Sequence, residues 1–84
     1  MNVEFVPTRN PIEEKLAQIW AEVLNIERVG VNNNFSNLGG DSLLATVLFS
    51  KVIETFKIET SLEEFYKRAT IAEQALFISS LIDI

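Results

Sequence analysis

Residues 35–46 read FSNLGGDSLLAT, and the rest of the chain is organised around the turn in this stretch. Gly39 and Gly40 favour a tight turn, because glycine adopts backbone conformations that other residues resist. Asp41 and Ser42 follow at once, and an apolar pattern of helical period begins directly after them. The stretch therefore predicts a turn that places Asp41 and Ser42 at the N-terminus of a helix.

The helix that follows the turn is predicted over about residues 42–56 and has two apolar surfaces. The surface expected to face the core has steps of three and four and consists of Ala45, Leu48, Phe49, Val52, Ile53 and Phe56. Leu43, Leu44 and Val47 lie on another side, near the helix start. Exposed apolar side chains grouped in this way mark a partner surface. Burial under the preceding loop is the alternative for these three residues.

The segment before the turn, residues 25–41, is predicted to be a long loop. It contains Gly30, three consecutive asparagines and the Gly39–Gly40 pair, which break any helix. A loop of this length in so short a chain is usually functional or disordered. Its apolar residues are expected to pin it across a helical bundle, and they are Val29, Val31, Phe35 and Leu38.

The helix before this loop is predicted over about residues 11–24. Asn10 is a favourable N-cap, Pro11 suits the first helical position, and Glu13 stands where a capping box needs it. The face expected in the core consists of Ile12, Leu16, Ile19, Trp20, Val23 and Leu24. The face expected in solvent consists of Glu13, Glu14, Lys15, Gln18 and Glu22.

Two further helices are predicted downstream. A short one spans about residues 62–67 after a Ser61 cap, with Leu62, Phe65 and Tyr66 expected in the core. Thr70 and Glu73 form a second capping box, which opens a helix over about residues 71–82. The core stripe of this helix is expected to be Ile71, Ala75, Ile78 and Ile82. Glu63, Glu64, Lys67 and Arg68 are interpreted as solvated surface.

These elements predict an all-α fold, a four-helix bundle of three main helices and one short third helix, with a long loop between the first two. The 84 residues are enough for one domain, with residues 1–9 as a linker-like N-terminal segment and 10–82 as the bundle. The N-terminus lacks an apolar signal segment, and no apolar run reaches the length of a membrane span. We therefore expect a cytoplasmic protein that does not bind membranes.

The composition excludes several kinds of chemistry. The chain contains neither cysteine nor histidine, so it has no disulfide, no His or Cys metal site, and no imidazole to activate a nucleophile. A net charge of −5 with scattered basic residues argues against nucleic-acid binding. Any reactive group must therefore come from other side chains or be attached to the chain later.

The stretch FSNLGGDSLLAT resembles the attachment motif of thiolation (peptidyl carrier) domains of nonribosomal peptide synthetases. These domains belong to the phosphopantetheine-binding acyl carrier protein superfamily. The segment IEEKLAQIWAEVL (12–24) resembles the first helix of that family, VGVNNNF (29–35) its loop, and ATIAEQA (69–75) the start of its last helix. The resemblance extends over roughly residues 7–82, and the order of the blocks makes it more specific than a short motif.

The resemblance implies a carrier that is not itself an enzyme. Ser42 matches the serine to which a phosphopantetheinyl transferase attaches 4′-phosphopantetheine from coenzyme A, with Gly40, Asp41 and Leu43 beside it. The arm would hold an aminoacyl or peptidyl group as a thioester. An adenylation domain would load it, a condensation domain would use it, and thioesterase or tailoring domains are further expected partners. The expected partner surface of this monomeric domain is Leu38, Leu43, Leu44 and Val47.

Asp41 departs from the histidine that many peptidyl carriers have before the serine. Asp-Ser-Leu is typical of acyl carriers of fatty-acid and polyketide synthesis, so a polyketide-type acyl carrier is one alternative. Acidic residues are sparse in this helix, where Glu54 is opposed by Lys51 and Lys57, and this favours the peptidyl type. A small helical adaptor without any prosthetic group is the other alternative. In that case Ser42 would be an ordinary N-cap, unless Asp41 is the cap and leaves the Ser42 hydroxyl free.

Overall fold

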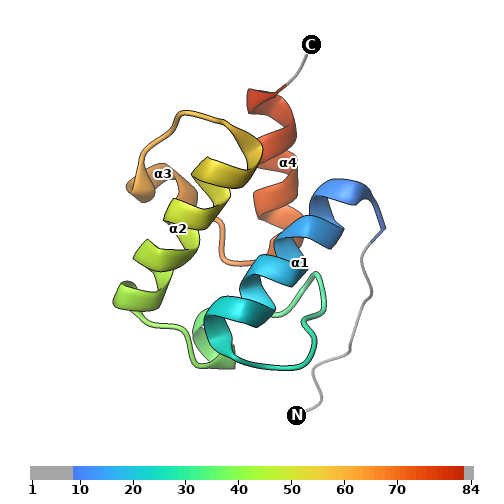
Figure 1. Ribbon diagram of the computed structural model, residues 1–84, viewed down its shortest axis with the longest axis vertical. Helices are drawn as coiled ribbons and strands as arrows, with labels where there is room; N and C mark the ends of the chain where they lie inside the picture. The colour runs from blue at the N-terminus through green and yellow to red at the C-terminus, as the bar shows by residue number, and fades with distance from the viewer. Residues whose placement is uncertain (1–8, 83–84) are drawn as a thin grey trace.

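The computed structural model describes residues 9–82 as a bundle of four α-helices (Figure 1). The helices are α1 (Pro11–Leu24), α2 (Ser42–Phe56), α3 (Leu62–Tyr66) and α4 (Ile71–Leu81), with a short 3₁₀ helix, η1 (Ser36–Leu38), before α2. The predicted all-α fold is confirmed, and α3 and α4 each end one residue earlier than expected. The expectations for residues 1–8 lie outside the described residues. None of the described helices is both long and apolar enough to cross a bilayer.

Side-chain caps fix where each helix begins. Every N-cap accepts a hydrogen bond from the backbone N–H three residues later. The predicted caps Asn10, Ser61 and Thr70 are confirmed, and of the two candidates at α2 the cap is Asp41. The caps and donors are Asn10 and Glu13 (2.9 Å), Asp41 and Leu44 (2.9 Å), Ser61 and Glu64 (3.1 Å), and Thr70 and Glu73 (3.2 Å). These caps depend only on neighbouring residues, so each helix start is determined locally.

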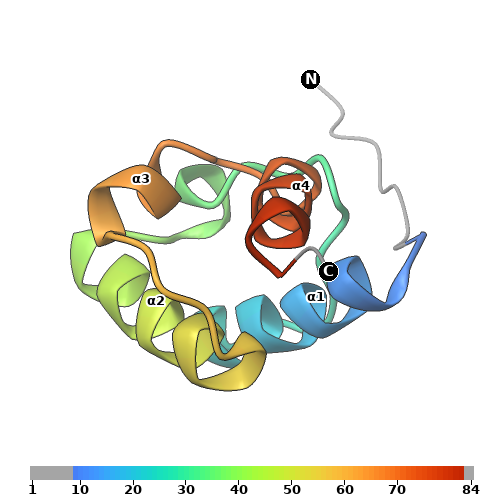
Figure 2. The same cartoon turned by 90° about the horizontal axis from the view of Figure 1, so that it is seen from above.

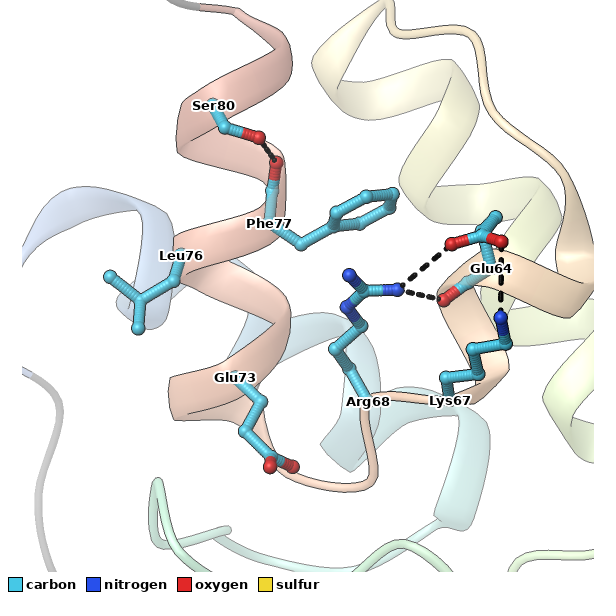
Figure 3. Close-up of a pocket in the computed structure, with 7 residues that line it drawn as sticks. All are labelled: Glu64, Lys67, Arg68, Glu73, Leu76, Phe77 and Ser80. Atoms are coloured by element: carbon cyan, nitrogen blue, oxygen red, sulfur yellow. Dashed lines mark hydrogen bonds and ion pairs between the residues drawn. The ribbon is translucent and has the colours of Figure 1, made fainter.

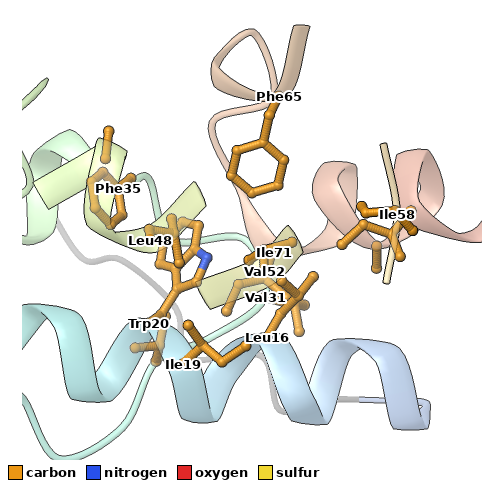
Figure 4. Packing of buried hydrophobic residues seen from close by; sticks show 14 residues of the cluster. Leu16, Ile19, Trp20, Val31, Phe35, Leu48, Val52, Ile58, Phe65 and Ile71 are labelled. Atoms are coloured by element: carbon orange, nitrogen blue, oxygen red, sulfur yellow. The ribbon is translucent and has the colours of Figure 1, made fainter. Parts of the chain in front are cut away.

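The core lies between α1, α2 and α4, and α3 closes one side of it against α2. Its buried apolar residues are Leu16, Ile19, Trp20, Val29, Val31, Phe35, Ala45, Leu48, Val52, Ile58, Phe65, Ile71, Ala75 and Ile78. Figure 4 shows the Trp20 indole rising from α1 toward Leu48 and Phe35. The Trp20 and Phe35 rings meet edge to face, with their centroids 5.0 Å apart. Such aromatic pairs stabilise a core beyond the area that they bury.

The long loop between α1 and α2 is tied to the connection between α3 and α4. The backbone N–H of Phe35 donates to the carbonyl of Ala69 at 3.0 Å, and that of Ala72 donates to Val31 at 3.0 Å. Figure 2 shows the two segments side by side. Within residues 9–82 the only β-type pairing is the isolated bridge between Asn34 and Thr70, which joins the same two segments. Val29, Val31 and Phe35 are buried, which confirms the predicted anchors of the loop, whereas Leu38 is half-buried.

One expectation for α1 was wrong. Glu13 was expected on the solvent face, but only 3% of its surface is exposed. Its Oε1 accepts the backbone N–H of Arg9 at 2.8 Å, and its Oε2 pairs with Arg9 Nη2 at 2.7 Å. The carboxylate tolerates burial because hydrogen bonds and an opposite charge replace its lost hydration.

Two expectations for the later helices were also wrong. Tyr66 was expected in the core but exposes 48% of its surface, because Phe65 fills the inward side of the five-residue α3. Ile82 was expected on the core stripe of α4, but it lies beyond the last helical residue, Leu81, and is 38% exposed. Ile71, Ala75 and Ile78 are buried as expected.

Candidate functional site

The two glycines before α2 serve different physical needs. Gly39 ends η1 with φ of +101°, a conformation that L side chains rarely adopt, and has open space around it. Gly40 has an ordinary φ, but a Cβ there would collide with the ring of Phe35 and lie 2.8 Å from the Phe35 carbonyl oxygen. The turn is therefore fixed by backbone conformation at Gly39 and by packing at Gly40.

Asp41 is the N-cap of α2 and Ser42 is the first helical residue. Asp41 Oδ1 accepts the backbone N–H of Leu44 at 2.9 Å, and its carbonyl accepts that of Ala45 at 2.8 Å. Ser42 is exposed, and in the described part of the chain no hydrogen bond engages its hydroxyl. This arrangement resolves the alternative left open by the sequence, since the capping role belongs to Asp41.

The electrostatic environment of Ser42 is that of a helix N-terminus. The first backbone N–H groups of α2 point toward this end of the helix, and the helix dipole gives it partial positive charge. The first turn of α2 contains no acidic residue. The Asp41 carboxylate at the N-cap offsets part of this positive charge, and the helix dipole with the remaining backbone N–H groups favours an anionic group on the Ser42 oxygen, as it favours phosphates at other helix N-termini.

The predicted partner residues divide into two pairs. Leu43 and Val47 are exposed, at 72% and 40% of their surface. Leu44 and Leu38 are half-buried and pack against the core cluster. The structure thus presents Leu43 and Val47 as apolar surface near Ser42, whereas Leu44 is partly buried against the core cluster.

Tyr66, which was expected in the core, is a surface residue of α3. It lines a cavity of about 140 Å³ together with Ala45, Leu48 and Phe35, which places α3 beside the first turns of α2. Its exposure follows from the short length of α3, a signal present in the sequence, because one turn of helix can bury only one side. The cavity is smaller than the roughly 300–1,000 Å³ of typical small-molecule sites.

A separate charged network connects α3 with α4 (Figure 3). Glu64 pairs with Lys67 at 3.2 Å and with Arg68 at 3.3 Å, and the Arg68 guanidinium lies 4.1 Å from the centre of the Phe77 ring. Hydrogen bonds from Lys67 and Arg68 lower the pKa of Glu64. These charges are satisfied by one another at the surface, which agrees with their interpretation as solvated surface and not as an acid pair for catalysis.

The comparisons with known proteins agree with this geometry. A family model described as a phosphopantetheine attachment site matches residues 14–78. Gramicidin S synthase 2 of Brevibacillus brevis is 46% identical over 76 residues, and Bacitracin synthase 1 of Bacillus licheniformis is 40% identical over 77 residues. These matches cover 90% and 92% of this chain, which spans about 2% of the length of either relative.

One solved structure contains a chain that matches this protein over almost its full length. It contains the phosphopantetheine transferase Sfp in complex with coenzyme A and a peptidyl carrier protein. The TM-score is 0.83 with 31% sequence identity, and the match covers 92% of this chain and 99% of the other.

Proposed function

The chain belongs to the phosphopantetheine attachment-site family as a peptidyl carrier domain, and from this premise we propose that Ser42 holds its 4′-phosphopantetheine arm. The observation that carries this assignment is the division of roles at the start of α2. Asp41 caps the helix, so the exposed Ser42 hydroxyl is not needed for folding and is accessible to another enzyme.

The residues around Ser42 fit a phosphodiester. The helix N-terminus favours the negative charge that the phosphate brings. Gly39 adds no side chain, and the space around it is open, so a transferase can approach closely. Gly40, Asp41 and Leu43 neighbour Ser42 in the sequence, and we propose that they lie beside the attached phosphate.

The attachment reaction forms one bond and breaks one. The Ser42 oxygen forms a bond to the pantetheine phosphorus of coenzyme A, the bond between this phosphorus and 3′,5′-ADP breaks, and the hydroxyl proton passes to a base of the transferase. Without histidine, this chain supplies no imidazole base of its own. Once bound, the arm supplies a thiol that holds an aminoacyl or peptidyl group as a thioester, a group that a chain without cysteine does not provide.

The role of the domain in a larger synthetase follows from this chemistry. We infer that an adenylation domain loads the thiol and that a condensation domain, and in turn thioesterase or tailoring domains, take the cargo. The domain acts as a monomeric, non-catalytic unit in the cytoplasm. The exposed Leu43 and Val47, with Leu44 and Leu38 behind them, form its partner surface.

The charge of α2 favours peptidyl cargo over polyketide-type cargo. Glu54 is the only acidic residue of Ser42–Phe56, and it lies far along the helix from Ser42. A carrier that meets basic partners through an acidic helix would need more carboxylates on this surface. Apolar contacts at Leu43 and Val47 are therefore the main contribution of α2 to partner binding.

Intact-mass measurement tests the proposal. The folded chain is incubated with coenzyme A and a broad-specificity phosphopantetheinyl transferase, beside Ser42→Ala and the matched control Ser50→Ala, an exposed serine of the same helix. We expect wild type and Ser50→Ala to gain one phosphopantetheine and Ser42→Ala to gain none. No gain on folded wild type would overturn the proposal in favour of an unmodified adaptor.

A further inference from the structure

Gly40 packs tightly against Phe35 beside the attachment site. The Gly40 N–H donates to the Phe35 carbonyl at 3.0 Å, and the Gly40 Cα lies so near the Phe35 ring that no Cβ fits. Only one residue, Asp41, separates this contact from Ser42. The position of the attachment serine is therefore closely coupled to the position of one aromatic ring.

The Phe35 ring is held inside the core, where it also borders the cavity of about 140 Å³ that it lines with Ala45 and Leu48. Only 4% of Phe35 is exposed, and the edge-to-face contact with Trp20 holds its ring on the α1 side. Its backbone N–H donates to the carbonyl of Ala69 in the connection between α3 and α4. A side chain at position 40 must therefore press the ring toward this cavity or displace the turn outward, and a displaced turn moves Asp41 and Ser42 with it.

Arm transfer is sensitive to a displacement of this kind. The Ser42 oxygen must reach the pantetheine phosphorus in line with the leaving group, and a misplacement of about 1 Å can cost roughly a hundredfold in rate. Val47, which belongs to the proposed partner surface, lies farther along α2 than Ser42, so a shift at the start of the helix displaces it less.

We propose that Phe35 and Gly40 are positioning residues for phosphopantetheine transfer, and that their contact fixes where the Ser42 hydroxyl stands on the end of the bundle. This inference rests on the proposed function of Ser42. It gives the buried Phe35 ring, which Trp20 contacts, a part in the modification reaction that is exerted through the turn.

The steric part is tested with Gly40→Ala, alone and combined with Phe35→Leu. We expect Gly40→Ala to lower kcat of the transfer by about tenfold or more, with KM changed less than twofold. The smaller leucine makes room beside position 40, so the double variant should recover a large part of kcat although its core is less well packed. Recovery of rate together with a further loss of stability is an outcome that a purely structural role would not give.

Two further variants test the inference even if Gly40→Ala does not fold. Phe35→Leu alone loosens the support of the turn and should lower kcat severalfold. The core variant Ile78→Ala alters α4 and not the turn. It should destabilise the domain but leave kcat unchanged when Ile78→Ala and Phe35→Leu are assayed under conditions in which both variants are folded. Equal kcat for Phe35→Leu, Ile78→Ala and wild type, or no recovery in the double variant, would overturn the inference. Failure of wild type itself to accept the arm would instead overturn the proposed function.

Discussion

The indole N–H of Trp20 donates a 3.0 Å hydrogen bond to the side-chain carbonyl of Gln74, and both side chains are buried. The Gln74 amide donates in turn to the carbonyl of Arg68 at 3.0 Å. One glutamine thus joins α1, α4 and the connection that follows α3. No buried side-chain nitrogen or oxygen in the described residues lacks a hydrogen-bond partner. Gln74 provides two of these bonds, one to the Trp20 indole of α1 and one to the Arg68 carbonyl after α3.

Gln74→Leu should therefore be among the most destabilising polar substitutions in the domain. Leucine fits a similar volume but leaves the Trp20 N–H and the Arg68 carbonyl without partners, at a cost of about 2–3 kcal/mol of the free energy of unfolding. Urea denaturation followed by Trp20 fluorescence measures this loss. Gln18→Ala on the exposed face of α1 is the control, with an expected change within about 0.5 kcal/mol. Equal stabilities of the two variants would contradict the prediction.

Asp41 and Ser42 should separate in their effects on stability and modification. Asp41→Ala removes the cap of α2 and should cost about 1 kcal/mol, whereas Asp41→Ser restores an acceptor and should cost less. Ser42→Ala should change stability by no more than about 0.5 kcal/mol while abolishing attachment of the arm. Thermal unfolding and intact mass on the same samples provide both readouts. A larger stability loss for Ser42→Ala than for Asp41→Ala would show that the capping assignment is wrong.

The exposed apolar residues of α2 should matter to partners and not to folding. Leu43→Ala and Val47→Ala together should lower kcat/KM for loading by the cognate adenylation domain about tenfold, which corresponds to about 1.4 kcal/mol of transition-state binding. Leu76→Ala is the matched control, since Leu76 on α4 is 75% exposed and Leu43 is 72% exposed. The control should load at the wild-type rate. If all three substitutions had the same effect on loading, α2 would not be the docking surface.

The pair of Arg9 and Glu13 predicts a specific acid dependence. Hydrogen bonds from the Arg9 guanidinium hold the pKa of Glu13 below its ordinary value of 4.5. A carboxyl whose pKa is lowered in the folded state stabilises the fold above its unfolded pKa, and this stabilisation disappears as the pH falls through the folded pKa. Wild type should therefore lose stability below about pH 4.5 more steeply than Glu13→Gln. The control is Glu14→Gln at the exposed neighbouring position, and parallel acid profiles of all three proteins would refute the coupling.

The helices and caps could be predicted from the sequence because their causes are local. Asn10, Asp41, Ser61 and Thr70 each bond to a backbone group three residues away, and this spacing can be recognised in the sequence. The same holds for the glycine turn before Ser42. The family resemblance then adds the role of the serine, which no spacing alone implies.

The misplaced residues depend on contacts that lie outside the helical pattern. Charge put Glu13 in solvent, although its spacing from Leu16 and Trp20 is that of the core face, and its partner Arg9 before the first turn of α1 makes burial possible. Tyr66 and Ile82 were assigned to the core by apolar character, although α3 is too short and α4 ends too early to bury them. Gly40 and Phe35 are only five residues apart in the sequence. The Phe35 ring, however, is held by Trp20, which lies fifteen residues earlier, and this contact is visible only in the fold.

Because Asp41 caps α2, the cap of the helix is the same whether the hydroxyl of the neighbouring Ser42 is free or occupied. Attachment of the arm breaks no bond that caps the helix, so the free energies of unfolding of the unmodified, modified and loaded forms should differ only by the contribution of an anion at a helix N-terminus, about 0.3–1 kcal/mol. Quality control by stability, such as selective proteolysis of unfolded chains, would then treat all three forms nearly alike. Any enzyme that distinguishes a charged carrier from an empty one must therefore recognise the arm and its cargo directly.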